Sequence, residues 1–157
     1  MIRGEASAVV RGVSPREVFD FVLDPVQYLK ADTKLLAVTK LADTEDGQIA
    51  REDGSFLGVA RGSLVTRYRW RPPSRIDVTL EHGFPRAMHN WFEIEGTALG
   101  ARVVHVEELE LGHGPLGWLH DLAVRGWWQR SVEREVAEIK RLLESGARGR
   151  GPPGRAA

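Results

Sequence analysis

The sequence predicts an α+β fold built from one antiparallel β-sheet, two short helices after the first strand and one long C-terminal helix. Three observations support this prediction. A capped helical segment, "SPREVFDFVLDP", follows a first alternating stretch, and residues 33–112 form short alternating runs separated by turn-forming residues. From Pro115 to about Ser145 the apolar residues then recur at helical spacing. A chain of 157 residues is long enough to fold as one such domain.

The first elements are a strand and two short helices. Residues 2–11 alternate weakly between apolar and polar side chains and are expected to form the strand. Ser14 then provides an N-cap that Glu17 completes as a capping box, and the dipeptide Asp24-Pro25 should end this helix. A second helical piece is expected over residues 25–32.

Six strands joined as hairpins are expected next, because "DTEDG", "EDGS", "RPPS", "HGFPR" and "EGTALG" interrupt the alternation. In residues 64–81 the apolar side chains fall mainly at even positions, so one face of the sheet should pack on the core and the other should face solvent. Arg67 and Arg69 belong to the solvent face, where we expect them to pair with Asp77 or Glu81.

The last helix should end at a cap formed by Gly146. An apolar stripe at steps of four and three runs along it: Val132, Val136, Ile139 and Leu143. The charges of "RSVEREVAEIKR" are interpreted as a solvated helix face. This helix should cover the apolar face of the sheet, and a curved sheet that does not contact it everywhere leaves a cavity. We place the domain at residues 1–146 and expect residues 147–157, rich in Gly, Pro and Arg, to be a disordered tail.

The composition excludes several classes of function. Lys plus Arg and Asp plus Glu both number 22, so no net field would attract nucleic acid or an anionic membrane. The chain has no cysteine, which excludes disulfides, thiolate metal sites and thiol nucleophiles. The start "MIRGEASAVV" lacks a secretory apolar region, and no apolar run approaches the roughly 20 residues needed to cross a bilayer. We therefore expect a cytoplasmic protein without nucleic-acid or integral membrane association.

Two polar side chains, His105 and Glu107, fall on the apolar face of the strand "ARVVHVEELEL". If the hairpin with the preceding strand turns around Thr97 and Ala98, the antiparallel partners are Phe92 with Val103, Asn90 with His105, and Met88 with Glu107. Asn90, His105 and Glu107 would then project together toward the core.

Three interpretations of this trio are open. In the first, it is a polar anchor that orients a carbonyl or hydroxyl of an otherwise apolar ligand. In the second, His105 is a general acid or base that Glu107 holds and tunes. In the third, the pair is a hydrogen-bonded polar group at the wet end of the sheet without a role in binding.

Further candidates for a cavity lining are aromatic residues on the predicted inner face and on the first half of the last helix, where Ala123 and Gly126 leave volume unfilled. Trp91 should instead pack on the outer face of the sheet. The candidate ligand-binding residues are Tyr68, Trp70, Met88, Asn90, Phe92, His105, Glu107, Trp118, Leu122 and Gly126.

Neither a metal centre nor another cofactor is expected. The five histidines are scattered without a recognised ligand spacing, and alternation places His89 on the face opposite to His105. The chain also lacks a nucleophile elbow, a Gly-rich phosphate loop and a paired-carboxylate signature.

Taken together, "VSPREVFDFVLDPVQY", the hairpin "WFEIEGTALGARVVHVEEL" and the long closing helix resemble the START-like superfamily, also called SRPBCC or polyketide cyclase/dehydratase-like. The resemblance covers residues 2–145 and implies a helix-grip fold, in which a curved antiparallel sheet wraps around the C-terminal helix. It also implies a deep apolar cavity for lipids, polyketides, sterols, quinones or hormones. Many members carry a Trp shortly after the Tyr of the second short helix, whereas "LKAD" follows Tyr28 here.

Because this superfamily includes carriers, enzymes and chaperone activators, the fold alone does not name the function. The first hypothesis is binding or transport of a hydrophobic small molecule in the cavity. The second is an aromatase/cyclase or dehydratase for a polyketide-like substrate, with His105 as proton shuttle and Asn90 positioning an oxygen. The third is a protein-interaction module similar to chaperone activators, which would use a surface patch.

Overall fold

The computed structural model describes residues 1–56, 60–112 and 115–149 of the chain. In chain order they form β1 (Ile2–Arg11), α1 (Pro15–Leu23), α2 (Pro25–Tyr28), β2 (Leu35–Thr44), β3 (Gly47–Phe56), β4 (Ala60–Arg71), β5 (Arg75–His82), β6 (Ala87–Thr97), β7 (Gly100–Glu110) and α3 (Pro115–Gly149). The α2 helix is shorter than the segment 25–32 that the sequence predicts, and tight turns continue the chain to Ala31.

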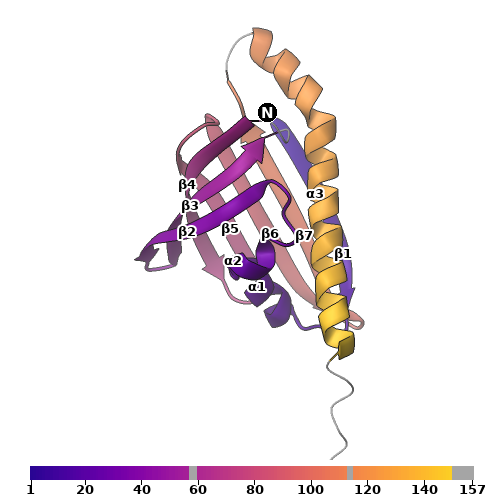
Figure 1. Cartoon of the computed structure of the whole chain (residues 1–157). Helices are drawn as coiled ribbons and strands as arrows, with labels where there is room; N and C mark the ends of the chain where they lie inside the picture. The colour runs from indigo at the N-terminus through magenta and orange to yellow at the C-terminus, as the bar shows by residue number, and fades with distance from the viewer. Residues whose placement is uncertain (57–59, 113–114, 150–157) are drawn as a thin grey trace, which may run out of the picture.

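The strands form one seven-stranded antiparallel sheet in the order β1-β7-β6-β5-β4-β3-β2. Consecutive strands from β2 to β7 are neighbours, while β1 pairs with β7 and thereby brings the first strand beside the last. The two short helices follow β1, and α3 runs along the β1 side of the curved sheet (Figure 1). The predicted α+β helix-grip fold is confirmed.

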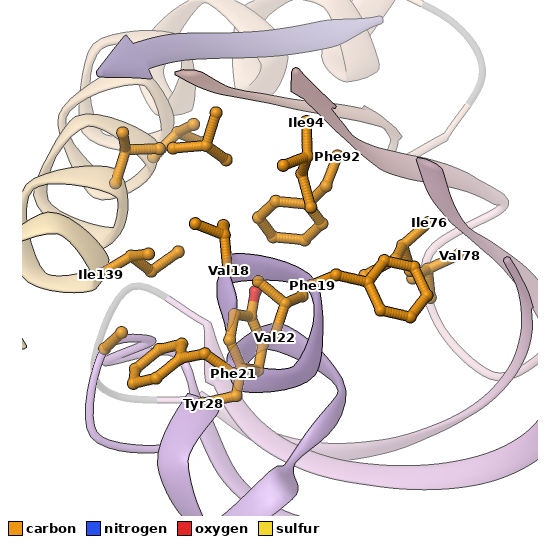
Figure 2. Close-up of a cluster of buried hydrophobic side chains, with 14 of the residues drawn as sticks. Val18, Phe19, Phe21, Val22, Tyr28, Ile76, Val78, Phe92, Ile94 and Ile139 are labelled. Atoms are coloured by element: carbon orange, nitrogen blue, oxygen red, sulfur yellow. The ribbon is translucent and has the colours of Figure 1, made fainter. Parts of the chain in front are cut away.

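The first helix begins as its sequence predicts. The backbone N–H of Ser14 donates to the Glu17 carboxylate at 2.7 Å, and the Ser14 hydroxyl accepts from the backbone N–H of Glu17 at 3.3 Å. These two bonds form the capping box. The buried face of α1 clusters with Phe92 and Ile94 of β6 and with Ile139 of α3 (Figure 2). The helix therefore covers one end of the sheet's inner face.

The β6–β7 hairpin differs from the predicted register by two positions. Thr97 pairs with Gly100, so the turn consists of Ala98 and Leu99. Gly100 has a φ of 149°, which favours glycine. The partners are Phe92 with His105, Asn90 with Glu107, and Met88 with Leu109. A shift of two residues keeps each side chain on its face, so the predicted inner face is correct although the pairing is wrong.

The α3 helix lies along β1 at one edge of the sheet, with fewer contacts to β7 (Figure 1). Gly4 marks the close approach of the two elements, because a Cβ at this position would lie 2.8 Å from Cγ2 of Val132. The helix thus packs tightly at the β1 edge and leaves space over the central strands.

The predicted stripe on α3 is buried at Val132, Val136 and Ile139. Gly146, however, does not cap the helix, which continues to Gly149. Residues 147–149 of the predicted tail are therefore helical, and residues 150–157 lie outside the described residues. No helix in the described part of the chain is long and apolar enough to cross a membrane.

The outer face of the sheet carries the expected charge pairs in part. Arg67 pairs with Glu81 at 2.6 Å, as predicted, while Arg69 pairs with Asp46 at 3.4 Å. Trp91 lies on this face, as predicted, and its ring contacts two guanidinium groups.

Candidate functional site

A cavity of about 400 Å³ lies between the inner face of the sheet, α1 and α3. This volume is within the range of small-molecule pockets. Exposed residues of β4 and of the β5–β6 loop, among them Arg61, Ser63 and Phe84, mark its opening. The apolar part of its wall consists largely of Val22, Ile76, Val78, Met88, Phe92, Leu109 and Trp128.

The structure places most of the predicted ligand-binding residues in this wall: Tyr68, Met88, Asn90, Phe92, His105 and Glu107. Trp70 lies on the inner face but outside the cavity lining. The expected positions of Leu122 and Gly126 were wrong. Leu122 is 58% exposed, and among the described residues a Cβ on Gly126 would meet only the side chain of Arg130, at 3.4 Å.

The orientation of α3 explains this correction. Val124, Trp128 and Val132 are buried at steps of four, which defines the inward stripe of the helix. Leu122 and Gly126 lie two positions from members of this stripe and therefore project from the opposite side. The side chain of Trp118 lies outside the described residues.

His105 lies at the centre of a buried charged cluster. Its ring stacks on Phe92 with the centroids 3.8 Å apart, and Nδ1 lies 3.0 Å from the carbonyl oxygen of Trp91. Nε2 lies 3.3 Å from Oε1 of Glu107 and 3.2 Å from Oε1 of Glu135. Because all these partners are acceptors, both ring nitrogens donate and the imidazole is protonated. Burial lowers the pKa of His105, but the two carboxylates outweigh this effect and raise it to about 10.

Lys34 and Glu135 complete the cluster. Oε1 of Glu135 accepts from the hydroxyl of Tyr28, and Oε2 accepts from Nζ of Lys34 at 2.8 Å. The same ammonium lies 3.1 Å from Oε1 of Glu107. Burial acts to raise the pKa of Glu135, but the charges of Lys34 and His105 outweigh it and hold this pKa below its usual range.

Asp32 also lines the cavity and is 4% exposed. Its Oδ1 accepts from the backbone N–H of Lys34 at 2.7 Å and lies 3.6 Å from Nζ of the same lysine. Burial raises the pKa of Asp32 from 3.8 to about 7, although the charge of Lys34 opposes this shift. The carboxyl therefore gains or loses its proton near neutral pH.

A second buried polar group lies on β3 and β4. Glu52 accepts from the hydroxyl of Tyr68 at 2.6 Å and from the hydroxyl of Thr66 at 2.8 Å. Burial raises the pKa of Glu52, while the two hydroxyl groups lower it in part. The hydroxyl proton of Tyr68 is thus engaged within the protein.

Two buried oxygens in the cavity wall have no hydrogen-bond partner among the described residues. They are Oδ1 of Asn90 and Oε2 of Glu107. The two residues are direct cross-strand partners in β6 and β7, so their side chains are neighbours on the inner face. These atoms are positions at which a bound molecule would complete the hydrogen bonding of the wall.

His105, Glu107 and Glu135 present possible metal-ligand atoms within 4.8 Å of one another. Nζ of Lys34, however, already bonds to both carboxylates, and Nε2 of His105 carries a proton that faces them. A metal ion would have to displace the ammonium and deprotonate the imidazolium. The two carboxylates are therefore better suited to the ammonium of Lys34 that they already bind than to a metal ion.

The sequence patterns did not single out several members of the site: Tyr28, Asp32, Lys34, Glu52 and Glu135. Glu135 had a recognisable signal, because it lies three residues after Val132 and four before Ile139, within the apolar stripe. Its interpretation as part of a solvated face was wrong, since it is 1% exposed. Asp32 and Lys34 precede β2 in a segment without periodicity, so no pattern points to them.

Known structures share this fold at low sequence identity. The protein TTHA0849 from Thermus thermophilus superposes with a TM-score of 0.76 and 16% identity, covering 92% of this chain and 97% of its own. The Zhui aromatase/cyclase from a Streptomyces species gives a TM-score of 0.81 and 12% identity, with coverages of 96% and 98%. The di-domain ARO/CYC BexL gives 0.68 and 21%, and the match covers 92% of this chain but 47% of BexL. No curated protein sequence gives a significant match.

A protein-family comparison covers nearly the whole chain. The family described as polyketide cyclase / dehydrase and lipid transport matches residues 1–144, from β1 into α3. The match includes every strand of the sheet and all residues of the charged cluster. The chain therefore belongs to the polyketide cyclase / dehydrase and lipid transport family, within the START-like, or SRPBCC, superfamily.

Proposed function

We propose that the protein binds a hydrophobic small molecule in the cavity and holds its polar group at Asn90 and Glu107. The observation that carries this proposal is a cavity of about 400 Å³ that combines apolar walls with one compact polar cluster. Burial of apolar surface supplies the affinity of such a site, and a few convergent polar groups fix the orientation of the ligand. Membership of a family described by lipid transport as well as cyclase activity supports this function.

The geometry of His105 favours binding over proton transfer by this residue. Both of its ring nitrogens donate to protein acceptors, and a pKa of about 10 keeps it protonated near neutral pH. A general acid or base is most effective when its pKa lies near the working pH. His105 therefore serves best as a fixed positive charge that orients Glu107.

A second candidate function is a polyketide aromatase/cyclase or dehydratase, which Asp32 favours. This carboxyl lines the cavity and has a pKa of about 7, close to the value suited to general acid–base catalysis. The name of one structural neighbour, an aromatase/cyclase, agrees with this alternative. In an enzyme, Asp32→Asn should lower turnover about 10²- to 10⁴-fold, whereas in a carrier it should leave ligand exchange intact.

Native mass spectrometry of freshly purified protein, followed by solvent extraction, tests the proposed function. We expect a retained apolar molecule that is lost in Val78→Trp, because Val78 lines the cavity and a larger side chain would fill it. The control is Leu41→Trp, since Leu41 is 55% exposed on β2. Retention that is equal in both variants would contradict a cavity site and would favour a surface-binding module.

A further inference from the structure

Most donors of the buried charged cluster are already engaged. The ammonium of Lys34 lies 2.8 Å from Oε2 of Glu135 and 3.1 Å from Oε1 of Glu107, and it forms a longer ion pair with Asp32 at 3.6 Å. Both ring nitrogens of His105 donate to protein oxygens. The two tyrosine hydroxyls of the wall donate to carboxylates, Tyr28 to Glu135 and Tyr68 to Glu52. Apart from Lys34 and the carboxyl of Asp32, which exchanges its proton near neutral pH, the cluster therefore has few protons to offer a ligand oxygen.

The acceptors of the cluster, unlike most of its donors, are not all engaged. Glu135 has partners at both carboxylate oxygens, whereas Glu107 has partners at one among the described residues. Glu135 receives Tyr28 and His105 at Oε1 and Lys34 at Oε2. Glu107 receives both Lys34 and His105 at Oε1, while its Oε2 has no partner among the described residues. Glu107 is 2% exposed and lines the cavity. An unpaired, buried carboxylate oxygen in a cavity wall is costly unless a bound donor completes it.

Asn90 provides the second contact at the same point. It is the direct cross-strand partner of Glu107, and such partners have Cβ atoms about 5 Å apart. Oδ1 of Asn90 is buried and also has no partner among the described residues. Because a side-chain amide can present either its oxygen or its NH₂ group to a neighbour, Asn90 can bond to a group that both donates and accepts.

We infer that the ligand carries a hydroxyl group, an alcohol or a phenol, which donates to Oε2 of Glu107 and also bonds to the amide of Asn90. This inference rests on the proposed function and specifies the chemical class of its ligand. A ligand carbonyl only accepts, so it would leave Oε2 of Glu107 unpaired and place two acceptors together. A ligand carboxylate would add a negative charge beside Glu107, where the charges of Lys34 and His105 are already balanced by Glu107 and Glu135.

Isothermal titration calorimetry with three probes of one ring system tests this inference. The probes are naphthol, its methyl ether methoxynaphthalene, which cannot donate, and naphthoate, which is anionic. A hydrogen bond to a charged acceptor should make naphthol bind about tenfold to a hundredfold more tightly than the ether. Naphthoate should bind more weakly than either neutral probe.

Two variants test whether Asn90 contributes to the preference for naphthol over the ether. Asn90→Leu removes an oxygen that has no partner among the described residues, and we expect it to reduce the preference for naphthol over the ether by about threefold to tenfold. Met88→Leu is the matched control, because Met88 lines the cavity on the same face of β6 and is replaced by a side chain of similar volume. It should change the affinities of naphthol and the ether by the same factor.

The outcomes separate this inference from the proposed function. Equal affinity of the wild-type protein for naphthol and the ether, with both bound in the cavity, would overturn the hydroxyl preference and leave the binding function intact. A preference for naphthol that Asn90→Leu does not reduce would overturn the role of Asn90 in it. Failure of all three probes to bind would contradict the apolar binding site itself, and the hydroxyl inference with it.

Discussion

Replacement of Glu135 by glutamine should destabilise the protein far more than an ordinary charge substitution on a helix. Glu135 is 1% exposed and faces two cations, Lys34 and His105, whose side chains are 11% and 1% exposed. In Glu135→Gln these two cations share Glu107 as their remaining close carboxylate partner, apart from Asp32 at 3.6 Å from Lys34. One buried positive charge is then poorly compensated.

The expected loss follows from the charges that remain. Removal of one partner of a buried ion pair typically costs about 3–5 kcal/mol. Asp32, whose pKa is about 7, can ionise beside the excess positive charge and offset part of this cost. We therefore expect a loss of about 3 kcal/mol at about pH 8, where Asp32 is ionised, and a larger loss, toward about 5 kcal/mol, at about pH 5, where it is protonated.

Urea denaturation followed by tryptophan fluorescence at both pH values measures this loss. The control is Glu138→Gln on the same helix, because Glu138 is 38% exposed and pairs with Arg141 at 2.8 Å. Such a surface pair contributes little, so the control should stay within about 0.5 kcal/mol of the wild type. A loss below about 1 kcal/mol for Glu135→Gln at both pH values would refute the argument that Glu135 balances a buried charge.

Three further predictions concern other parts of the structure. In the folded chain the pKa of Asp32 is raised from 3.8 to about 7, so its contribution to stability is greatest below about pH 4 and falls as the pH rises to 7. Asp32→Asn should remove this dependence and be more stable than the wild type at about pH 8; equal slopes of stability against pH for the two proteins would contradict it. Ser14→Ala removes the N-cap of α1 and should cost about 1 kcal/mol in denaturation without changing ligand affinity, and a loss of affinity at unchanged stability would contradict this. Gly4→Ala should lower the free energy of unfolding by about 1–3 kcal/mol, because its Cβ would lie 2.8 Å from Val132; an unchanged midpoint would show that α3 moves away from β1 without cost.

The sequence was most informative where periodicity carries the signal. Alternation placed His105, Glu107 and Asn90 on the inner face, and the structure puts all three in the cavity wall. The capping box of Ser14 and Glu17 is present as predicted. These features depend on neighbouring residues in the chain, whose geometry is fixed by the strand or helix itself.

The remaining features depend on how elements meet in space. The β6–β7 register depends on which residues form the turn, and a two-residue shift leaves the alternation unchanged, so the pattern alone could not determine it. In the sequence, Glu135 is indistinguishable from the charged residues of a solvent-exposed helix face, because its partners, Lys34 and His105, come from segments distant in the chain. Leu122 was misplaced for a related reason, since the rotation of α3 about its axis is set by packing on β1.

The position of β1 determines the order in which the chain can fold. Its hydrogen-bonded neighbour is β7, and its inner face packs against α3. The first strand therefore cannot form its native contacts before the last strand and the last helix are present. Contacts of such long sequence separation slow folding, because the intervening chain must be ordered before they form. During synthesis the hairpins from β2 to β7 can pair one after another as they emerge, while β1 remains without its ladder. Glu135, which pairs with Lys34 and His105, comes from α3, so the charged cluster is complete only when this helix has docked. The docking of the final helix thus both covers the inner face of the first strand and completes the buried charged cluster.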